Sequence, residues 1–519
     1  MDAAADVLFH SGNIFALTSD APGPAPDASA IAISNGRILA TGTRSSLSIY
    51  ERPETRVIDL DGMVVLPGFI DAHTHMVHEG LKQVHADLAD VPTRDAALET
   101  LKTHAATTDA SDSEWIIGLG YDESTWPSQQ PPGRADLDRI ATDRPVAMLR
   151  VDMHTAVLNS YALNEFGPAI DPDLMRYNDG EATGIVLEDA ISVISPVVNP
   201  SIPETRRVLD HAIRLANQRG ITGVHDKVRN SHAPRVYRDL DRDGSLSLRV
   251  RIDYWMDHLE SLQAVGVGTN HGTEMVRVGA IKSFSDGSIG ARTAKLQQAY
   301  HDGGSHGDTR GEWVVRPSVL NDRATGAAKD DFQLAIHAIG DEAIDEVIDI
   351  LAALPCRRHR IEHVELASQE AMERMAAHEL VASMQPNFHQ WAQSGGLYEQ
   401  ALGTTRTAKT NRFRELHDRG VTLAFGSDCM PMDPLFGIHC AVNAPTAAQS
   451  LSVGEAIAAY TSGAAFAGFD DRRVGSLRPG YCADLVVLAD SPWEQPTAIR
   501  EIDVAMTVVD GTIVYEQCA

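Results

Sequence analysis

This chain of 519 residues has very little lysine, few cysteines and no long apolar run. Only seven of its 44 basic residues are lysines, against 72 acidic residues, and the formal net charge is −28. Such an excess of negative charge disfavours nucleic acid and anionic membranes as partners. No stretch approaches the roughly 18 uninterrupted apolar residues of a membrane-spanning helix, and the first residues lack the basic segment of a signal peptide. We therefore expect a cytoplasmic protein.

The acid excess and the scarcity of lysine together resemble the composition of proteins from salt-rich cytoplasm, where ionic strength screens self-repulsion. A GC-rich genome favours arginine codons and would explain the scarce lysine, but not the acid excess. We therefore expect a halophilic protein.

The five cysteines are scattered without a C-x-x-C pair, which argues against a disulfide framework and against a zinc ribbon.

Both ends of the chain are rich in short strands with tight turns. An Asn-Gly turn within residues 31–40 and an Asp-Gly turn within residues 508–514 predict a hairpin near each terminus. Residues 1–65 and 466–519 are accordingly expected to form the two parts of one small β-sandwich domain.

The middle of the chain, residues 66–465, alternates apolar strand-like runs, among them Val146–Arg150, with helical stretches. This alternation is typical of parallel sheets in the α/β class, and a closed (β/α)8 barrel of the TIM type is the best match. Residues from about 78 to 140 break the rhythm and are expected to form an insertion over the barrel mouth.

The residues most able to carry chemistry follow the apolar run 64–72. Residues two apart in a strand point to the same face, so His73 and His75 can present two imidazoles as a pair of metal ligands. In a βα barrel the carboxyl ends of the strands meet on one rim. Four more candidates lie at or just after later strand-like runs, namely Lys282, His337, His363 and Asp428. A core histidine held by hydrogen bonds is the alternative for any single histidine, but the six residues together predict a metal-dependent hydrolase.

Lys282 is informative because lysine is so rare in this chain. Arginine stays protonated, whereas a lysine amine whose pKa is lowered by burial can become a carbamate. A carbamate offers two oxygens and can bridge two divalent metal ions. The alternative is an ordinary lysine that forms an ion pair with Asp286.

Several segments of the chain resemble the amidohydrolase superfamily, and more closely the amidohydrolase-3 family that includes N-substituted formamide deformylases. The resemblance spans nearly the whole chain. It implies a (β/α)8 barrel with a β-sandwich built from both termini, and hydrolysis of a non-peptide C–N bond in a small-molecule amide or formamide. The matching segments are residues 67–75 (PGFIDAHTH), 115–122 (WIIGLGYD), 150–154 (RVDMH), 220–226 (GITGVHD), 282–292 (KSFSDGSIGAR), 337–341 (HAIGD), 360–363 (RIEH), 427–428 (SD) and 475–486 (GSLRPGYCADLV).

The resemblance also implies roles for the six candidate ligands. His73 and His75 would bind the more buried ion, carboxylated Lys282 would bridge, and His337 and His363 would bind a second ion. Asp428, with His363 beside it in the catalytic set, would take a proton from the attacking water and return it to the leaving nitrogen. Zinc suits imidazole and carboxylate ligands best. Iron and manganese stay open, as does the choice between one ion and two.

Four further residues are candidates for substrate contact. Arg150 and His154 lie in the RVDMH segment, and Asp286 and Arg292 lie in the segment that begins at Lys282. For each of them a structural hydrogen bond or a role in a turn is the alternative.

Two alternatives to amide hydrolysis stay open. One is a cyclic amidase or a deaminase on the same scaffold, since one metal–water centre serves several leaving groups. The other is a catalytically silent barrel that acts as a binding module, which loss of a ligand or of Asp428 would indicate; this chain has lost neither. A homodimer is an expectation at the level of the family.

Overall fold

A computed structural model describes most of the chain, namely residues 4–18, 22–89, 91–107, 115–123, 126–128, 130–151, 155–194, 200–229, 232–303, 309–355 and 357–517. The chain divides into two compact units. We call Met1–His75 together with Ile213–Ala519 the barrel unit, and Met76–Ala212 the inserted unit. Within the described ranges no helix has both the length and the apolar character needed to cross a bilayer.

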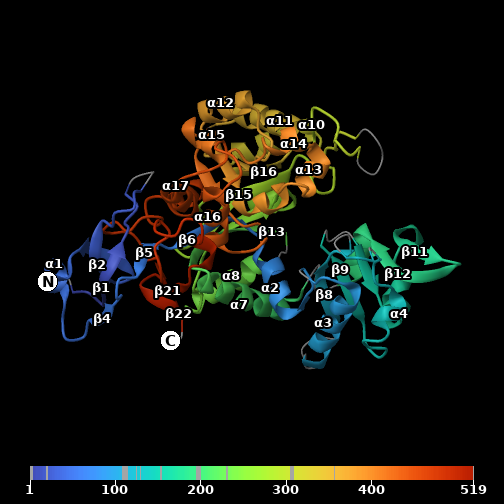
Figure 1. The fold of residues 1–519 in the computed structure, drawn as a ribbon, viewed down its shortest axis with the longest axis horizontal. Helices are drawn as coiled ribbons and strands as arrows, with labels where there is room; N and C mark the ends of the chain where they lie inside the picture. The colour runs from blue at the N-terminus through green and yellow to red at the C-terminus, as the bar shows by residue number, and fades with distance from the viewer. Residues whose placement is uncertain are drawn as a thin grey trace. The chain divides into compact units, whose positions relative to one another are not determined.

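Eight parallel strands form the central sheet of the barrel unit, in the order β19-β18-β17-β16-β15-β14-β13-β6. Figure 1 labels four of them, β6, β13, β15 and β16. Nearly every residue of these strands is buried, as expected where helices cover a parallel sheet. The predicted (β/α)8 barrel is therefore confirmed. The strands are β6 (Phe69–Thr74), β13 (Ile221–Val228), β14 (Arg249–Trp255), β15 (Val276–Phe284), β16 (Leu334–Ala338), β17 (Arg360–His363), β18 (Val381–Met384) and β19 (Leu423–Phe425).

Helices with one apolar side connect these strands. In α11 (Asp341–Ala352) the buried residues include Ile344, Val347 and Leu351, which recur at the spacing of one helix face. Its first turn carries Asp341 and Glu342, whose negative charge suits the positive end of the helix dipole. The other α-helices of this unit that follow β13 are α8 (Ala233–Arg242), α9 (Leu259–Ala264), α10 (Pro317–Lys329), α12 (Gln369–Ala377), α13 (Leu397–Leu402), α14 (Thr404–Thr407), α15 (Phe413–Asp418), α16 (Pro434–Val442), α17 (Val453–Ala458) and α18 (Ala464–Ala467).

Side-chain hydrogen bonds join the first and last barrel strands. The sheet order begins at β19 and ends at β6, and the described residues of these two strands form no ladder with each other. Instead the buried carboxylate of Asp71 accepts hydrogen bonds from Ser427 N at 3.0 Å and from Ser427 Oγ at 2.5 Å. The backbone N–H of Asp428 donates to His73 O at 2.8 Å. These bonds place the loop after β19 against the end of β6.

Strands from both ends of the chain share one mixed sheet, in the order β22-β21-β20-β5-β1-β2-β3, with β4 paired to β1. In Figure 1 the blue N-terminal strands accordingly lie beside the red C-terminal strands. Asn35-Gly36 and Asp510-Gly511 form the two hairpin turns, and all four residues have positive φ. The predicted small β-domain built from both termini is confirmed. Its elements are β1 (Val7–Ile14), β2 (Ala28–Ser34), β3 (Arg37–Gly42), α1 (Arg44–Leu47), β4 (Arg56–Asp59), β5 (Val64–Pro67), β20 (Leu485–Leu488), β21 (Val504–Val509) and β22 (Thr512–Glu516).

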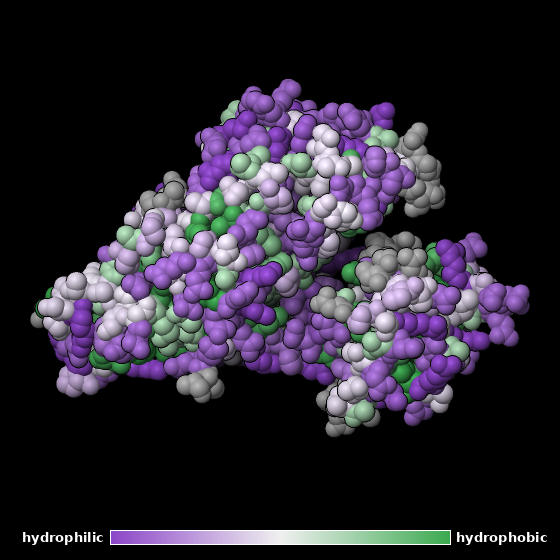
Figure 2. Space-filling model, viewed as in Figure 1, coloured by the Kyte–Doolittle hydropathy of each residue, from purple (hydrophilic) through white to green (hydrophobic). Residues whose placement is uncertain are grey.

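Hydrophilic residues predominate on the face of the molecule shown in Figure 2. The large hydrophobic side chains that are exposed, such as Ile49 and Val265, are scattered along the chain. Isolated exposed apolar residues are normal on soluble proteins and need no special explanation.

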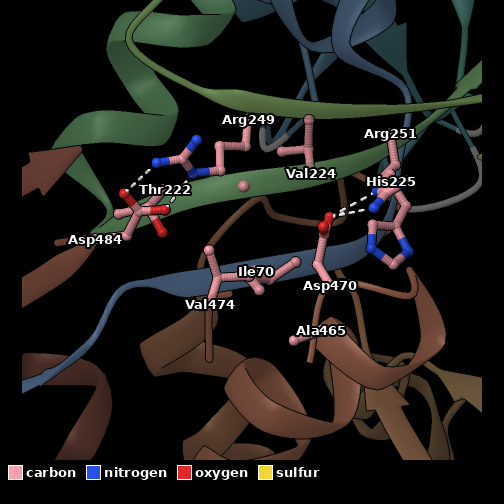
Figure 3. A pocket seen from close by; sticks show the side chains of 11 residues that line it. Ile70, Thr222, Val224, His225, Arg249, Arg251, Ala465, Asp470, Val474 and Asp484 are labelled. Carbon is pink, nitrogen blue, oxygen red and sulfur yellow. Dashed lines mark hydrogen bonds and ion pairs between the residues drawn. The ribbon is translucent and has the colours of Figure 1, made fainter. Parts of the chain in front are cut away.

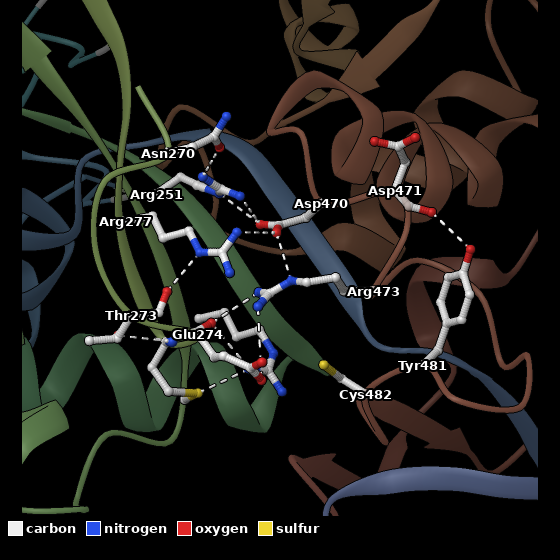
Figure 4. Close-up of polar contacts among 12 residues, drawn as sticks. Arg251, Asn270, Thr273, Glu274, Arg277, Asp470, Asp471, Arg473, Tyr481 and Cys482 are labelled. Atoms are coloured by element: carbon white, nitrogen blue, oxygen red, sulfur yellow. Dashed lines mark hydrogen bonds and ion pairs between the residues drawn. The ribbon is translucent and has the colours of Figure 1, made fainter. Parts of the chain in front are cut away.

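Buried arginines link the barrel to the C-terminal segment at the start of β14 (Figure 3). Arg249 donates to both carboxylate oxygens of Asp484, at 2.5 and 3.0 Å, and Arg251 Nε donates to Asp470 at 2.7 Å. Between them lies a cavity of about 20 Å³, room for about one water. Figure 4 shows Asp470 also meeting Arg473. These contacts lie at the amino ends of barrel strands, the end that usually serves stability.

The inserted unit has its own sheet, in the order β11-β12-β10-β9-β8-β7. Alternate residues of its strands enter two cores, with Ile117 and Leu149 in one and Ile116 and Met148 in the other. The elements are α2 (Met76–Val84), β7 (Ala86–Asp87), α3 (Arg94–Thr107), β8 (Ile116–Tyr121), α4 (Arg134–Leu137), β9 (Val146–Arg150), β10 (Thr155–Leu158), α5 (Ser160–Phe166), β11 (Met175–Asn178) and β12 (Glu181–Leu187), followed by α7 (Ile202–Gln218), which crosses into the barrel unit.

One expectation about this region was wrong. Val146–Arg150, expected as a barrel strand, is β9 and pairs with β8 and β10 of the inserted unit. A short apolar run has the same composition in either sheet, so only its pairing partners decide where it belongs. The unit also extends to Ala212, beyond the expected insertion at about 78–140, because β10 and β12 continue the sheet that β8 and β9 begin.

Candidate metal centre

His73 and His75 lie at the carboxyl end of β6, and Asp428 lies three residues beyond β19. Asp428 Oδ1 is 3.3 Å from His75 Nε2 and 3.7 Å from His73 Nε2. The three possible ligand atoms all lie within 4.8 Å of one another. His73 is fully buried, while His75 and Asp428 are partly accessible. Two imidazole nitrogens and a carboxylate oxygen thus converge at a partly open position on the barrel rim.

The remaining ring nitrogens of these histidines have acceptors. His73 Nδ1 lies 2.5 Å from Glu362 Oε2, and His75 Nδ1 lies 3.2 Å from the carbonyl oxygen of Lys227. With Nδ1–H donated in each case, both rings present the Nε2 lone pair toward Asp428. Hydrogen bonds of this kind commonly fix the tautomer and orientation of metal-binding histidines.

His337 and His363 stand next to this pair. The ring centroid of His363 is 4.9 Å from that of His73 and 4.4 Å from that of His337. His363 Nδ1 lies 2.6 Å from Gln385 Oε1, which leaves Nε2 free. His337 Nε2 instead donates to Gly287 O at 2.9 Å, so this ring offers Nδ1. Four imidazoles therefore gather at one end of the barrel.

Lys282 lies in β15, 1% exposed, with its Nζ 4.8 Å from the ring centroid of Phe284. It forms no ion pair within the described part of the chain, and the alternative pairing with Asp286 is therefore not observed. Asp286 instead accepts backbone hydrogen bonds, at 2.8 to 3.1 Å, from Lys295, Ile339 and Gly340. Burial lowers the pKa of Lys282 to about 8, with Lys227 nearby adding to the effect.

Burial also makes three of the site's histidines poor proton acceptors. It lowers the pKa of His363 to about 4 and holds the pKa values of His73 and His337 well below the ordinary range. These imidazoles are therefore neutral near pH 7, with a lone pair available. Burial alone would raise the pKa of Asp428, but the imidazoles beside it, His73 first, hold it well below its ordinary range. Asp428 is accordingly a carboxylate.

Residues 56–515 match the model of the amidohydrolase-3 group, an amidohydrolase family. The chain belongs to the amidohydrolase family. It is 30% identical to the putative amidohydrolase YtcJ of Bacillus subtilis, over 98% of this chain and 99% of the relative. It is 28% identical to the N-substituted formamide deformylase of Arthrobacter pascens, over 94% and 95% of the two chains. A crystal structure of an uncharacterized metal-dependent hydrolase from Pyrococcus furiosus superposes with a TM-score of 0.78 at 27% identity, over 94% of this chain and 99% of that one.

This amidohydrolase brings the six predicted ligands to one end of one barrel, but the four substrate candidates do not join them as a group. Arg150 belongs to the inserted unit and pairs with Asp122 and Glu123, at 3.1 and 2.9 Å. Arg292 pairs with Asp302 at 2.6 Å. The Asp286 carboxylate accepts backbone hydrogen bonds, although its Oδ1 also lies 3.7 Å from His337 Nε2. His154 lies outside the described residues.

A buried charge cluster beneath the histidines was missed by reasoning from the sequence. Glu362 contacts His73, and Arg360 Nη2 lies 2.9 Å from Glu362 Oε1. Lys227 Nζ donates to Asp253 Oδ2 at 2.6 Å. Arg360 and Glu362 belong to the RIEH segment, where only His363 was singled out. The signal that could have revealed the cluster was the pair of charged residues, Arg360 and Glu362, at alternate positions of a strand that is wholly buried.

Proposed function

We propose that this amidohydrolase hydrolyses a non-peptide C–N bond of a small-molecule amide, with a divalent metal ion held among His73, His75, His337, His363, Lys282 and Asp428. The convergence of His73 Nε2, His75 Nε2 and Asp428 Oδ1 within 4.8 Å carries this proposal. Family membership alone makes the chain a hydrolase, and the site supports the finer assignment.

The donor set fits a divalent metal. His73, His337 and His363 are neutral and Asp428 is ionised, which are the protonation states that metal ligands need. The Nδ1 atoms of His73, His75 and His363 lie within hydrogen-bond distance of Glu362, the Lys227 carbonyl and Gln385, respectively. The Nε2 lone pairs of these rings therefore point to the common site. Imidazole with carboxylate suits zinc best among the common divalent ions.

Lys282 is the buried lysine suited to carboxylation. The barrel interior holds a second buried lysine, Lys227, but its ammonium is bound by Asp253 and by the carbonyl oxygens of Ala72 and His225. Lys282 has no such partners within the described residues, and burial favours its neutral amine. A carbamate on Lys282 would add anionic oxygens beside His363 and Asp428, whose charge an additional divalent ion would balance.

Proton transfer would fall to Asp428. A bound divalent ion would supply Lewis-acid activation of water and of a substrate carbonyl. Asp428 Oδ1, partly accessible at the rim, would accept a proton from the attacking water and deliver it to the leaving nitrogen. Similarity to an N-substituted formamide deformylase over nearly the whole chain supports N-formyl and N-acyl amides as the first substrates to test.

Metal content tests the proposal. The protein, purified in high salt with bicarbonate, should contain one to two equivalents of zinc or another divalent ion by elemental analysis, and the metal-loaded form should hydrolyse N-formyl amides. Lys282→Ala should lower the metal content, while Lys329→Ala, which removes an exposed lysine, should not. A folded wild type without metal would contradict the proposal and favour a silent binding module.

A further inference from the structure

Glu362 lies beneath the imidazole of His73 and is held from several sides. Its Oε2 is 2.5 Å from His73 Nδ1 and accepts a second hydrogen bond from Ser383 Oγ at 2.7 Å. Its Oε1 lies 2.9 Å from Arg360 Nη2. The side chain is fully buried. Glu362 therefore has little freedom to move away from the His73 ring.

His73 is the histidine of this site whose outer ring nitrogen, the one away from the proposed metal, lies within hydrogen-bond distance of a carboxylate. The Asp286 carboxylate lies 3.7 Å from His337 Nε2, beyond that distance. The corresponding acceptors of the other rings are neutral oxygens, the carbonyls of Lys227 and Gly287 and the amide of Gln385. A hydrogen bond to a carboxylate is shorter and about twice as strong as a neutral one. It also raises the basicity of the ligand nitrogen on the opposite side of the ring.

Two cations balance the buried carboxylates. Lys227 Nζ lies 2.6 Å from Asp253 Oδ2 and 4.0 Å from Glu362 Oε2, and Arg360 Nη1 lies 3.1 Å from Asp253 Oδ2. None of the four residues is more than 2% exposed. Replacing such a buried ionic set by apolar side chains is often neutral or stabilising. Stability alone therefore gives no reason for a charge at position 362, whereas the contact with His73 does.

We propose that Glu362 is a positioning residue that fixes His73 with Nδ1 protonated and Nε2 directed at the metal, and so strengthens metal binding. The proposal rests on the metal centre proposed above. Arg360 and Lys227 have the subordinate role of keeping a negative charge beneath the ring.

The test is the affinity of the full-length, metal-stripped protein for Zn²⁺, measured by competition with a chromogenic chelator. Glu362→Gln keeps the shape of the side chain and removes the charge, and it should weaken Zn²⁺ binding by about 10- to 100-fold. Ser383→Ala is the matched control, because it removes the other hydrogen bond to the same oxygen, together with one from Arg360 Nη2 to Ser383 Oγ, without touching His73. Its affinity should stay close to that of the wild type.

A proton signal separates positioning from general damage to the core. In the metal-loaded wild type, the Nδ1–H of His73 should give a strongly deshielded ¹H NMR resonance, which Glu362→Gln should abolish and Ser383→Ala should keep. Should Glu362→Gln not fold because Arg360 loses one of its two carboxylate partners, the double variant Arg360→Gln/Glu362→Gln removes both charges and leaves the pair of Lys227 and Asp253. The same loss of affinity is expected there.

The two proposals fail in different ways. A wild type that binds no Zn²⁺ contradicts the metal centre itself. A wild type that binds Zn²⁺ while a folded Glu362→Gln, or the folded double variant, binds it equally well overturns the role of Glu362 alone. Equal weakening in Ser383→Ala and Glu362→Gln would also overturn it, since a general disturbance of the core would then explain the effect.

Discussion

At the scale of single residues, burial assigns the protonation states on which the proposed chemistry depends. It makes the imidazoles of His73, His337 and His363 neutral and lowers the pKa of Lys282 to about 8, while Asp428 stays ionised among the rings. Imidazole lone pairs and a proton acceptor thus coexist near pH 7, and the neutral amine of Lys282 joins them as the pH rises through about 8. No residue type guarantees these states, since an exposed histidine or lysine would titrate elsewhere.

Asp428→Asn should reduce kcat by about 10²- to 10⁴-fold, the contribution typical of a general acid–base group. The amide cannot accept the proton of the attacking water, although it keeps the shape of the side chain. Metal content should persist, because the histidines and Lys282 remain. Asp349→Asn, at an exposed position of α11, should leave kcat unchanged. Wild-type turnover by Asp428→Asn on the same amide substrate would refute the proposed role.

Bicarbonate should promote metal uptake in a pH-dependent way set by Lys282. Carbamate forms from the neutral amine, which is populated above the pKa of Lys282 at about 8, rather than above about 10.4 as in an exposed lysine. The bicarbonate-dependent gain in metal uptake by stripped protein should rise between about pH 6.5 and 8.5 and then level off. Lys282→Ala should show no gain. A wild-type gain that keeps rising through pH 10 would argue against a lowered pKa.

At the scale of elements, the strand ends depart from regular geometry where the site is formed. His363 and Val364 at the end of β17 have φ of 76° and 54°, and Asp428 has φ of 50°. Positive φ is uncommon for residues other than glycine, and for a β-branched residue such as Val364 it is a real outlier. Strand alternation would place Glu362 and His363 on opposite faces. The altered backbone lets both approach His73.

Asp71→Ala should loosen the contact between β6 and the loop after β19. It removes the acceptor of three hydrogen bonds, two from Ser427 and one from His73 N at 3.1 Å. Leaving buried donors unpaired should cost about 2–4 kcal/mol in the free energy of unfolding, and kcat should fall because Asp428 is displaced. Thermal melts and turnover measure both effects. Asp71→Asn, which keeps an acceptor oxygen, should lose less; full activity in Asp71→Ala would contradict this coupling.

At the scale of the whole molecule, the large net negative charge is the main physical feature. A net charge of −28 opposes compaction by self-repulsion, and the face in Figure 2 is largely hydrophilic. Salt shortens the range of this repulsion, from about 10 Å at 0.1 M to about 3 Å at 1 M. The halophilic character expected from composition therefore stays a prediction that stability measurements can check.

Raising KCl from 0.1 to 2 M should increase the melting temperature of the metal-loaded protein, because the acidic surface is screened. Sucrose at matched osmolality controls for solute exclusion, which stabilises proteins without screening charge. The increase in KCl should exceed that in sucrose. A melting temperature that is flat or falls with KCl would show that the acid excess reflects something other than adaptation to salt.

The sequence by itself determined the βα alternation, the two terminal hairpins and the six candidate ligands, because periodicity, turn chemistry and strand-end positions are local properties. Tertiary structure decided which strands pair and which distant residues touch, because the local sequence pattern does not specify either. It placed Val146–Arg150 in the inserted unit and brought Glu362 beneath His73. It also distinguished the bound ammonium of Lys227 from the unpaired Lys282 within the described residues. Strand pairing and burial arise from contacts between residues far apart in the chain, so neither can be predicted from one segment alone.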